Sequence, residues 1–408
     1  MSSTLTHIET EKQLVPALRF KEFEGDYSKR ILKDFTKINQ GLQIPISERY
    51  SEQVEGSYFY ITNEFLRKGS KKSYFIKNPT ESVICTEEEI LMTRTGNTGQ
   101  VVTGVHGAFH NNFFKIKFDE TCEKWYLYFF LTSYITQHKI LTLAGTSTIP
   151  DLNHGDFYKL KITMPKYPEQ QKIASFLSAV DEKIQQLTKK KALLEQYKKG
   201  VMQQLFSGQL RFKDENGNSY PDWDERRLDQ IAEIVGGGTP ETVKPDYWDG
   251  EIQWFTPTEI RSKYISNSKR TITQSGLSKS SAKLLPAGTI LFTSRATIAE
   301  LGFATRECTT NQGFQSLIVN QNNISEFIYQ LIKVNKNEFV KKSQGSTFLE
   351  ISSKEMKKMK FEVPIFEEQQ KIATYLSRID TKIGSVNNQI TQTQTFKKGL
   401  LQQMFVAA

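Results

Sequence analysis

Two groups of residues in this 408-residue chain have types and spacings that could support catalysis. His106 and His110 stand four positions apart, the spacing at which two imidazoles on one helix can bind zinc. Gly107 occupies the position where such a helix would carry its catalytic glutamate. Asp222 and Glu225, which two arginines follow, could belong to a nuclease, but the lysine and the intervening strand of such a site are missing. We therefore expect polar loop or turn residues at both places, with no metal site and no catalytic residues.

Two catalytic motifs are absent from the whole sequence. An aminomethyltransferase that uses S-adenosylmethionine would carry Asn/Asp-Pro-Pro-Tyr/Phe, yet none of the 12 prolines is followed by another. No Gly-Lys dipeptide occurs, so the Walker loop that cradles the phosphates of ATP is missing. The sequence predicts that this chain neither methylates nor hydrolyses ATP by these routes.

The composition indicates a basic chain without a membrane span. The 54 Lys and Arg residues exceed the 45 Asp and Glu residues, which gives a net charge of +9 and favours an acidic partner such as nucleic acid. No apolar run is long enough to cross a bilayer, and the polar N-terminus does not resemble a secretory signal, so we expect a cytoplasmic protein. Cys85, Cys122 and Cys308 are widely spaced and are expected to be buried thiols.

An internal repeat organises the chain. The 16 residues 169–184 return as residues 368–383 with 11 identities, at an offset of 199 positions. Residues 197–206 return as residues 396–405 at the same offset. Because the offset is about half the chain length, the sequence predicts two similar halves.

Apolar residues within both copies recur at alternating steps of four and three. This stripe is typical of a coiled coil, so it predicts two long helices, each about 57 Å long, that bury their stripes against each other. The residues predicted to form this helix-pair seam are Ile173, Leu177, Val180, Ile184, Leu187, Ile372, Leu376, Ile379, Ile383 and Val386. Gly200 and Gly399 stand at matched places inside the helices, where they indicate either the close approach of a partner or a helix break.

The segments between the helices repeat more loosely. Ile90–Thr93, for example, is echoed by residues 290–293, and each segment carries one predicted amphipathic helix, at residues 125–140 and 325–341. Short β-branched runs and turn signals fill the rest, so the fold class is predicted to be α+β, with two domains in a pseudo-twofold repeat and two long helices forming an antiparallel coiled coil. The predicted segments are residues 1–166 (first domain), 167–208 (central helix), 209–363 (second domain) and 364–408 (C-terminal helix).

These motifs together resemble those of one family, the specificity subunits of bacterial type I restriction-modification enzymes. Pro-x-x-x-Glu-Gln-Gln-Lys-Ile-Ala begins at Pro165 and again at Pro364, and Lys-Lys-Gly-x-x-Gln-Gln precedes Phe206 and Phe405. The resemblance covers essentially the whole chain. It implies two target-recognition domains that read a bipartite, asymmetric DNA target, with the helix pair setting the spacing between the half-sites.

The resemblance also implies partners. Two methyltransferase (modification) subunits would dock on the helices, and restriction subunits would join the assembly. This chain would be non-catalytic and would bind no cofactor, because S-adenosylmethionine, ATP and magnesium would belong to its partners. The partner-docking candidates are Gln170, Gln171, Gly200, Gln369, Gln370 and Gly399.

Loop side chains are the expected means of reading DNA bases. The base-reading candidates follow the two matched Ile-Leu strands and are Arg94, Thr95, Asn97, Thr98, Ser294, Arg295 and Thr297. Arginine can bind guanine through two hydrogen bonds, and asparagine can bind adenine in the same way. Arg94 and Arg295 could instead be structural or contact only phosphate. The phosphate-contact candidates are Lys71, Lys72, Lys115, Lys263, Lys269 and Arg270.

Two other classes of protein remain open from the sequence. One is the recognition part of a fused nuclease-methyltransferase, against which the missing Pro-Pro motif and the lack of room for a catalytic domain both count. The other is a coiled-coil scaffold that binds no DNA. Strongly salt-dependent retention on duplex DNA would separate the scaffold from a specificity subunit.

Overall fold

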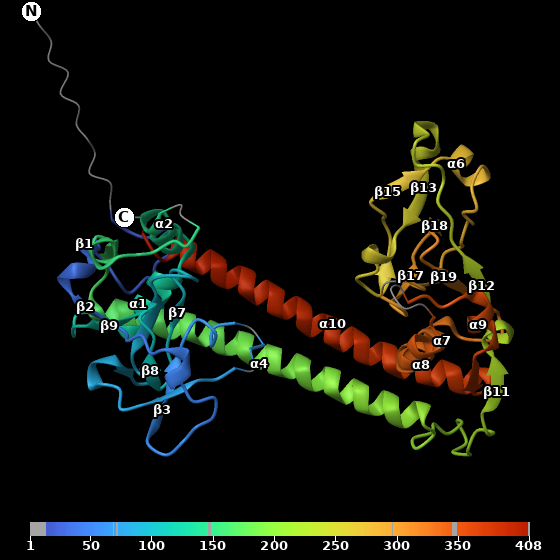
Figure 1. Ribbon diagram of the computed structural model, residues 1–408, viewed down its shortest axis with the longest axis horizontal. Helices are drawn as coiled ribbons and strands as arrows, with labels where there is room; N and C mark the ends of the chain where they lie inside the picture. The colour runs from blue at the N-terminus through green and yellow to red at the C-terminus, as the bar shows by residue number, and fades with distance from the viewer. Residues whose placement is uncertain are drawn as a thin grey trace, which may run out of the picture. The chain divides into compact units, whose positions relative to one another are not determined.

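The computed structural model describes residues 14–67, 69–70, 72–145, 148–295, 297–344 and 349–406 (Figure 1). The chain forms two compact units: unit 1 comprises Met1–Thr188 and Asn388–Ala408, and unit 2 comprises Lys189–Asn387. Each unit has its own core and contains part of each long helix. Among the described residues, no helix is both long and apolar enough to span a membrane.

The described part of unit 1 contains three sheets. The first has the order β2 (Thr36–Gln40), β9 (Phe113–Phe118), β6 (Ile90–Thr93), β7 (Val101–Val102). The second has the order β4 (Phe75–Lys77), β3 (Ser57–Ile61), β8 (Gly107–Phe109), β5 (Ile84–Cys85). The third pairs β1 (Ser28–Ile31) with β10 (Lys161–Met164), which leads into the first long helix.

Unit 2 has a similar plan that differs in its edge strands. Its first sheet has the order β12 (Ala232–Gly236), β19 (Gln315–Val319), β16 (Ile290–Phe292), β17 (Leu301–Ala304), β14 (Tyr264–Ile265). The second has the order β15 (Arg270–Ile272), β13 (Trp248–Phe255), β18 (Cys308–Thr310), and the third pairs β11 (Asp224–Arg227) with β20 (Lys360–Val363). The second sheet of each unit contains one parallel pair, β3 with β8 in unit 1 and β13 with β18 in unit 2. The loose sequence echoes therefore mark a shared scaffold, as predicted.

Each predicted amphipathic helix is in fact two helices, so the prediction of one continuous helix per segment is wrong. The helices of unit 1 are α1 (Lys124–Thr132), α2 (Tyr134–Ala144) and α3 (His154–Tyr158), and those of unit 2 are α5 (Leu228–Ile231), α6 (Gln274–Ser278), α7 (Ser325–Val334), α8 (Lys336–Lys341) and α9 (Ser353–Lys358). Ser133 separates α1 from α2 because its backbone is extended and its hydroxyl accepts the N–H of Thr136 as an N-cap. Asn335 separates α7 from α8, and its side-chain amide donates to the carbonyl of Leu331.

The two long helices form as predicted. They are α4 (Tyr167–Phe206, 40 residues) and α10 (Phe366–Gln403, 38 residues), and both continue through their glycines, so the helix-break interpretation is wrong. In unit 2, Lys191 Nζ lies 2.9 Å from Asn387 Oδ1 and Lys198 Nζ lies 2.6 Å from Asp380 Oδ1. Since the partner number falls as the α4 number rises, the helices run antiparallel there.

The predicted seam residues are buried or half-buried, but they pack on more than the opposite helix. In unit 1, Ile173 and Leu177 of α4 share one hydrophobic cluster with Leu127 of α1 and Leu400 of α10. In unit 2, Leu376 of α10 lies in a cluster that contains residues of both α4 and α7. The stripe is therefore also the edge of each domain's core, which a coiled-coil pattern alone does not predict.

The three cysteines are buried thiols, as predicted. Burial raises the pKa of Cys85 to about 11 and the pKa of Cys122 and of Cys308 to about 12. All three thiols therefore stay protonated near neutral pH, which makes them weak nucleophiles and weak metal ligands.

The two groups first considered for catalysis do not form sites in the described residues. Strand β8 separates His106 from His110, so the two imidazoles do not share a helix face. Glu225 lies in β11 and pairs with Lys360 at 2.7 Å, which corrects the expectation that it lies in a turn.

Candidate nucleic-acid interface

Each unit carries the same tight turn at the end of a core strand. In unit 1, the hydroxyl of Thr93 donates to the carbonyl of Asn97 and accepts the N–H of Gln100 at 2.8 Å. In unit 2, Thr293 forms the equivalent turn and accepts the N–H of Glu300 at 2.9 Å. The two candidate base-reading loops therefore share the same threonine hydrogen bonds, although their sequences differ.

A second segment lies beside each turn and was missed by the sequence reasoning. In unit 1, Asp151 forms an antiparallel bridge with Thr95. In unit 2, Glu350 forms the same bridge with Arg295. A sequence signal was present, since Gly-Thr-Ser at residues 145–147 is echoed by Gly-Ser-Thr at residues 345–347.

These contacts define which loop residues correspond. The carbonyl of Arg94 accepts the N–H of Leu152 at 2.8 Å, and the carbonyl of Ser294 accepts the N–H of Ile351 at 3.1 Å. Arg94 therefore corresponds to Ser294, whereas Arg295 corresponds to Thr95. The two arginines occupy different positions of the same turn.

Two base-reading candidates are buried, and the prediction is corrected for them. Ser294 is completely buried, and its hydroxyl has no hydrogen-bond partner among the described residues. Thr98 is also buried, and its hydroxyl donates to the carbonyls of Arg94 and Pro150 at 3.2 and 2.6 Å. A side chain enclosed by protein cannot reach a base edge, so both residues support the turn instead.

The other base-reading candidates differ in exposure. Asn97, Arg295 and Thr297 are exposed, whereas Arg94 and Thr95 are half-buried. The base-reading role of these five residues stays a prediction.

Two of the predicted phosphate contacts are already neutralised inside the protein. Lys115 is buried, with Nζ 2.5 Å from the carbonyl of Ile84 and 3.3 Å from the carboxylate of Glu89. Lys263 lies 2.7 Å from the carboxylate of Glu326. An ammonium group held by an internal acid gains little from phosphate, so both assignments are corrected.

The remaining phosphate candidates are exposed where the structure describes them. Lys72, Lys269 and Arg270 are on the surface, and the guanidinium of Arg270 stacks 3.4 Å from the ring centroid of Trp248. Lys71 lies outside the described residues.

The repeated Glu-Gln-Gln motif ties each long helix to its own domain. In unit 1, the buried carboxylate of Glu169 accepts two hydrogen bonds from Arg19, both at 2.8 Å, and one from the hydroxyl of Tyr27 at 2.8 Å. In unit 2, Glu368 accepts two from Arg211 at 2.8 Å, and Trp223 Nε1 donates to it at 3.1 Å.

The first glutamine of each motif is internal, and this corrects its predicted docking role. The amide of Gln170 accepts the N–H of Glu123 at 2.9 Å and donates to the carbonyl of Thr121 at 3.0 Å. Gln369 accepts the N–H of Ile324 at 2.9 Å. Since both glutamines are buried, no partner subunit can reach them in this conformation.

The other docking candidates lie on accessible helix faces. Gln171 and Gln370 are exposed. A Cβ atom added to Gly200 or Gly399 would meet nothing within 4 Å, so packing among the described residues does not require either glycine. Their docking role stays a prediction.

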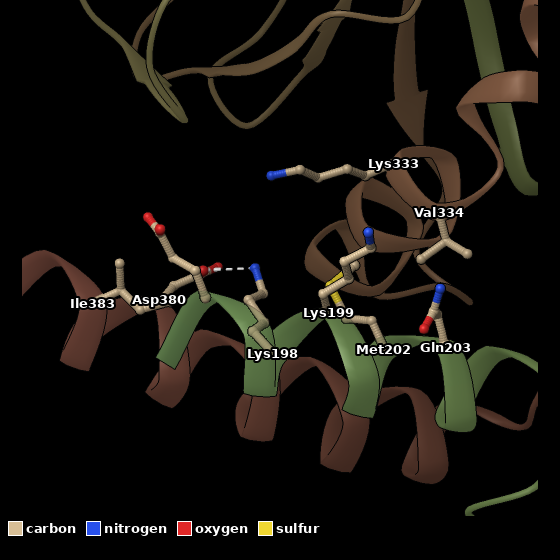
Figure 2. Close-up of a pocket in the computed structure, with 9 residues that line it drawn as sticks. Lys198, Lys199, Met202, Gln203, Lys333, Val334, Asp380 and Ile383 are labelled. Atoms are coloured by element: carbon tan, nitrogen blue, oxygen red, sulfur yellow. Dashed lines mark hydrogen bonds and ion pairs between the residues drawn. The ribbon is translucent and has the colours of Figure 1, made fainter. Parts of the chain in front are cut away.

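A charged cavity of about 490 Å³ lies beside α4 and α10 in unit 2, and Figure 2 shows the ion pair between Lys198 and Asp380 in its wall. Asp380 also contacts Lys263 at 3.3 Å, and Lys198 contacts Gln330 at 3.4 Å. Burial lowers the pKa of Lys198 below its ordinary value, and Asp380 offsets this only in part. Burial opposes ionisation of Asp380 too, but the hydrogen bond and charge of Lys198, together with Lys263, bring its pKa below the ordinary value.

The comparisons with known proteins agree with this architecture. Residues 24–196 and 220–393 each match the family described as the type I restriction modification DNA specificity domain. The chain is 39% identical over 190 residues to the type I restriction enzyme MjaIX specificity subunit of Methanocaldococcus jannaschii, a match that spans 45% of this chain and only 44% of that relative. It is 25% identical to the MjaVIII specificity subunit of the same organism, over 94% of both chains.

A solved structure shares the fold. The S subunit of a type I restriction-modification system from M. genitalium superimposes with a TM-score of 0.59 at 18% identity, covering 97% of this chain and all of that one. Since the two family matches together take up most of the sequence, the chain belongs to the family of type I restriction-modification DNA specificity domains, and it carries two copies of that domain.

Proposed function

We propose that this chain is the cytoplasmic specificity subunit of a type I restriction-modification complex, in which each unit reads one half of a bipartite, asymmetric DNA target. One observation carries the proposal. The two units present different side chains from the same turn, Thr95 and Asn97 in unit 1 and Arg295 and Thr297 in unit 2. A constant scaffold with variable loop residues, of which all but the half-buried Thr95 are exposed, suits two different base sequences.

The long helices would set the spacing between the half-sites. Each is about 57–60 Å long at 1.5 Å per residue, compared with about 34 Å for one turn of B-DNA. Their near-identical repeats contrast with the divergent loops, and this is the pattern expected if the helices serve one constant purpose and the loops serve two different sequences.

DNA retention tests this proposal directly. The purified chain, alone and with its modification subunit, is titrated with a fluorescent 40-base-pair duplex at several salt concentrations. We expect log K to fall linearly with log salt, by about 0.9 per phosphate contacted. Absence of salt-dependent binding in both samples would contradict the proposal and favour a scaffold. Methylation of DNA by the purified chain alone would favour the fused-enzyme alternative, because we propose that S-adenosylmethionine, ATP and magnesium are bound by the partners.

Matched exposed aromatic residues support docking of two modification subunits. Tyr197 is 52% exposed, and Phe396, its counterpart at an offset of 199, is 55% exposed. Each stands three residues before an open glycine, Gly200 or Gly399, so each lies on the same helix face as that glycine. The two surfaces are similar, although the hydroxyl of Tyr197 also contacts the hydroxyl of Tyr375 at 2.6 Å. Two similar surfaces of this kind fit two copies of one partner, and the restriction subunits would join the resulting complex.

Alanine substitutions test the docking surface. We expect Tyr197→Ala and Phe396→Ala each to leave one modification subunit per chain, and the double variant to leave none, as measured by native mass spectrometry. Leu193→Ala is the matched control, because Leu193 is 56% exposed on α4 but its repeat counterpart, Gln392, is polar. Retention of both partner copies by the double variant would exclude this surface.

A further inference from the structure

An arginine and a carboxylate pair at the same junction of both units, although the residues that form the pair are not equivalent. In unit 2, Arg295 Nε lies 2.8 Å from Glu350 Oε1. In unit 1, Arg94 Nη2 lies 2.6 Å from Asp151 Oδ2. The acids correspond to each other by their backbone bridges, but the arginines are shifted by one position in the turn.

The backbone fixes both acids. Glu350 exchanges two hydrogen bonds with Gln344, each 2.9 Å long, while it bridges Arg295 on its other side. In unit 1, a single hydrogen bond joins the N–H of Asp151 to the carbonyl of Ala144, at 3.2 Å. Because each acid is held between two neighbouring segments, it can fix the orientation of a guanidinium group beside it.

The two guanidinium groups pair with their acids through different nitrogens. Glu350 pairs with Arg295 at Nε, and neither terminal nitrogen of this side chain, which is 45% exposed, has a hydrogen-bond partner among the described residues. Asp151 binds Arg94 through the terminal Nη2, and Arg94 Nε is buried without a hydrogen-bond partner among the described residues. The Arg94 side chain is only 21% exposed and lies over the ring of Phe114. A guanine needs two donors from one edge of the arginine, and of these two residues only Arg295 offers them.

We propose that Arg295 reads a guanine in the half-site of unit 2, that Glu350 is the residue that positions it, and that Arg94 is a structural residue that reads no base. This inference rests on the proposed function, since it assigns residues within the proposed DNA-reading loops. At the position of Arg295, unit 1 carries Thr95, so its half-site has no arginine-read guanine at the matching place.

Sequencing of methylated sites in cells that carry the complete system tests the assignment, together with binding of the purified complex to its target. We expect Arg295→Ala to weaken target binding about 10-fold or more and to make one guanine of one half-site degenerate. Arg295→Lys should also lose that guanine while keeping the salt dependence, because lysine retains the charge but not the two-pronged donor geometry. Glu350→Gln, whose amide oxygen can still accept from Nε, should preserve the guanine, whereas Glu350→Ala should relax it.

Two comparisons make the outcome decisive. Arg94→Ala should leave the recognised sequence unchanged, as should Arg226→Ala, which removes an arginine from an exposed pair with Asp224 on β11. An unchanged sequence for Arg295→Ala, or a relaxed one for Arg94→Ala, overturns the assignment. If the unsubstituted complex shows no sequence preference, the proposed function fails and not merely this assignment.

Discussion

Units 1 and 2 keep the same attachment between helix and domain but surround their interhelical ion pairs differently. In unit 1, Lys397 of α10 lies 2.6 Å from Asp181 of α4 and 5.1 Å from the ring of Phe129. In unit 2, the repeat-related Lys198 lies 2.6 Å from Asp380. The same two residue types thus meet in both units with the helices exchanged.

The neighbouring helix accounts for the difference. Ile324 and Glu123 correspond to each other, since equivalent glutamines bind their N–H groups. Counting along the helices from these two residues, Gln330 of α7 corresponds to Phe129 of α1. Gln330 donates to Asp380 at 3.3 Å and joins the pair to Glu326 and Lys263, whereas an aromatic ring cannot extend the network. The repeated helices therefore preserve the ion pair, and the neighbouring helix of each domain determines which other polar groups contact it.

The carboxylate clamps should show the largest effect, and an equal one in both units. Glu169→Ala leaves Arg19 and Tyr27 without their buried acceptor, and Glu368→Ala does the same to Arg211 and Trp223. We expect each to cost about 3–5 kcal/mol, because three hydrogen bonds to a charged group are lost and their largely buried donors are left without an acceptor. Amide hydrogen exchange on the full chain should show lost protection in the unit that carries the change.

The exposed neighbour Glu367 provides the control for these clamps. Glu367→Ala should change stability by less than about 0.5 kcal/mol. If the clamp variants lowered exchange protection only in unit 2, or in neither unit, the matched geometry would not stabilise the two units equally.

The ion pairs should differ between the units by a smaller amount. Asp380→Asn leaves both Lys198 and Lys263 without this counter-charge, and we expect a cost of about 2–3 kcal/mol. Asp181→Asn frees only Lys397, which keeps its aromatic neighbour, and should cost about 1 kcal/mol. Exchange rates of α4 and α10 amides measure both, and equal losses would contradict a role for the network.

Acid should abolish the contribution of Asp380. Although burial opposes its ionisation, its two lysine neighbours hold its folded-state pKa below the ordinary 3.8. The stabilisation is therefore complete above about pH 4 and is lost as the pH falls through the lowered pKa. The stability difference between the unsubstituted chain and Asp380→Asn should be full at pH 7 and shrink towards pH 2, as measured by denaturant unfolding. A difference that persisted at the lowest pH would exclude the ion pair as its origin.

The repeated glycines should give the smallest effect, with the opposite sign. Gly200→Ala and Gly399→Ala should each stabilise the isolated chain by about 0.5–1 kcal/mol, because the helix gains a better former and the new methyl group meets nothing. Gly384→Ala on α10 is the control, since Gly384 also faces open space but its repeat position is Gln185.

Partner binding separates the repeated glycines from this control. If Gly200 and Gly399 admit a partner's backbone, their alanine variants should bind the modification subunit more weakly than Gly384→Ala does. Equal binding by all three variants would leave the repeated glycines without a docking role.

Local and periodic features were predictable from the sequence. The α4 and α10 stripes, the matched strands and the Gly96–Gly99 turn follow from residue spacing and backbone preference, which act over a few positions. The break at Ser133 was missed because the apolar periodicity continues across it, although an N-cap serine is a local signal.

The sequence by itself determined that two similar domains alternate with two similar long helices, because repetition and periodicity are properties of order along the chain. Only the tertiary structure decided which repeated residues face inward. Gln170 is internal because it binds Glu123 and Thr121, which lie 47 and 49 positions away. Arg94 differs from Arg295 because their acids, Asp151 and Glu350, lie more than 50 positions away along the chain. Burial and hydrogen bonding depend on such distant neighbours, which cannot be identified from a single segment of the sequence.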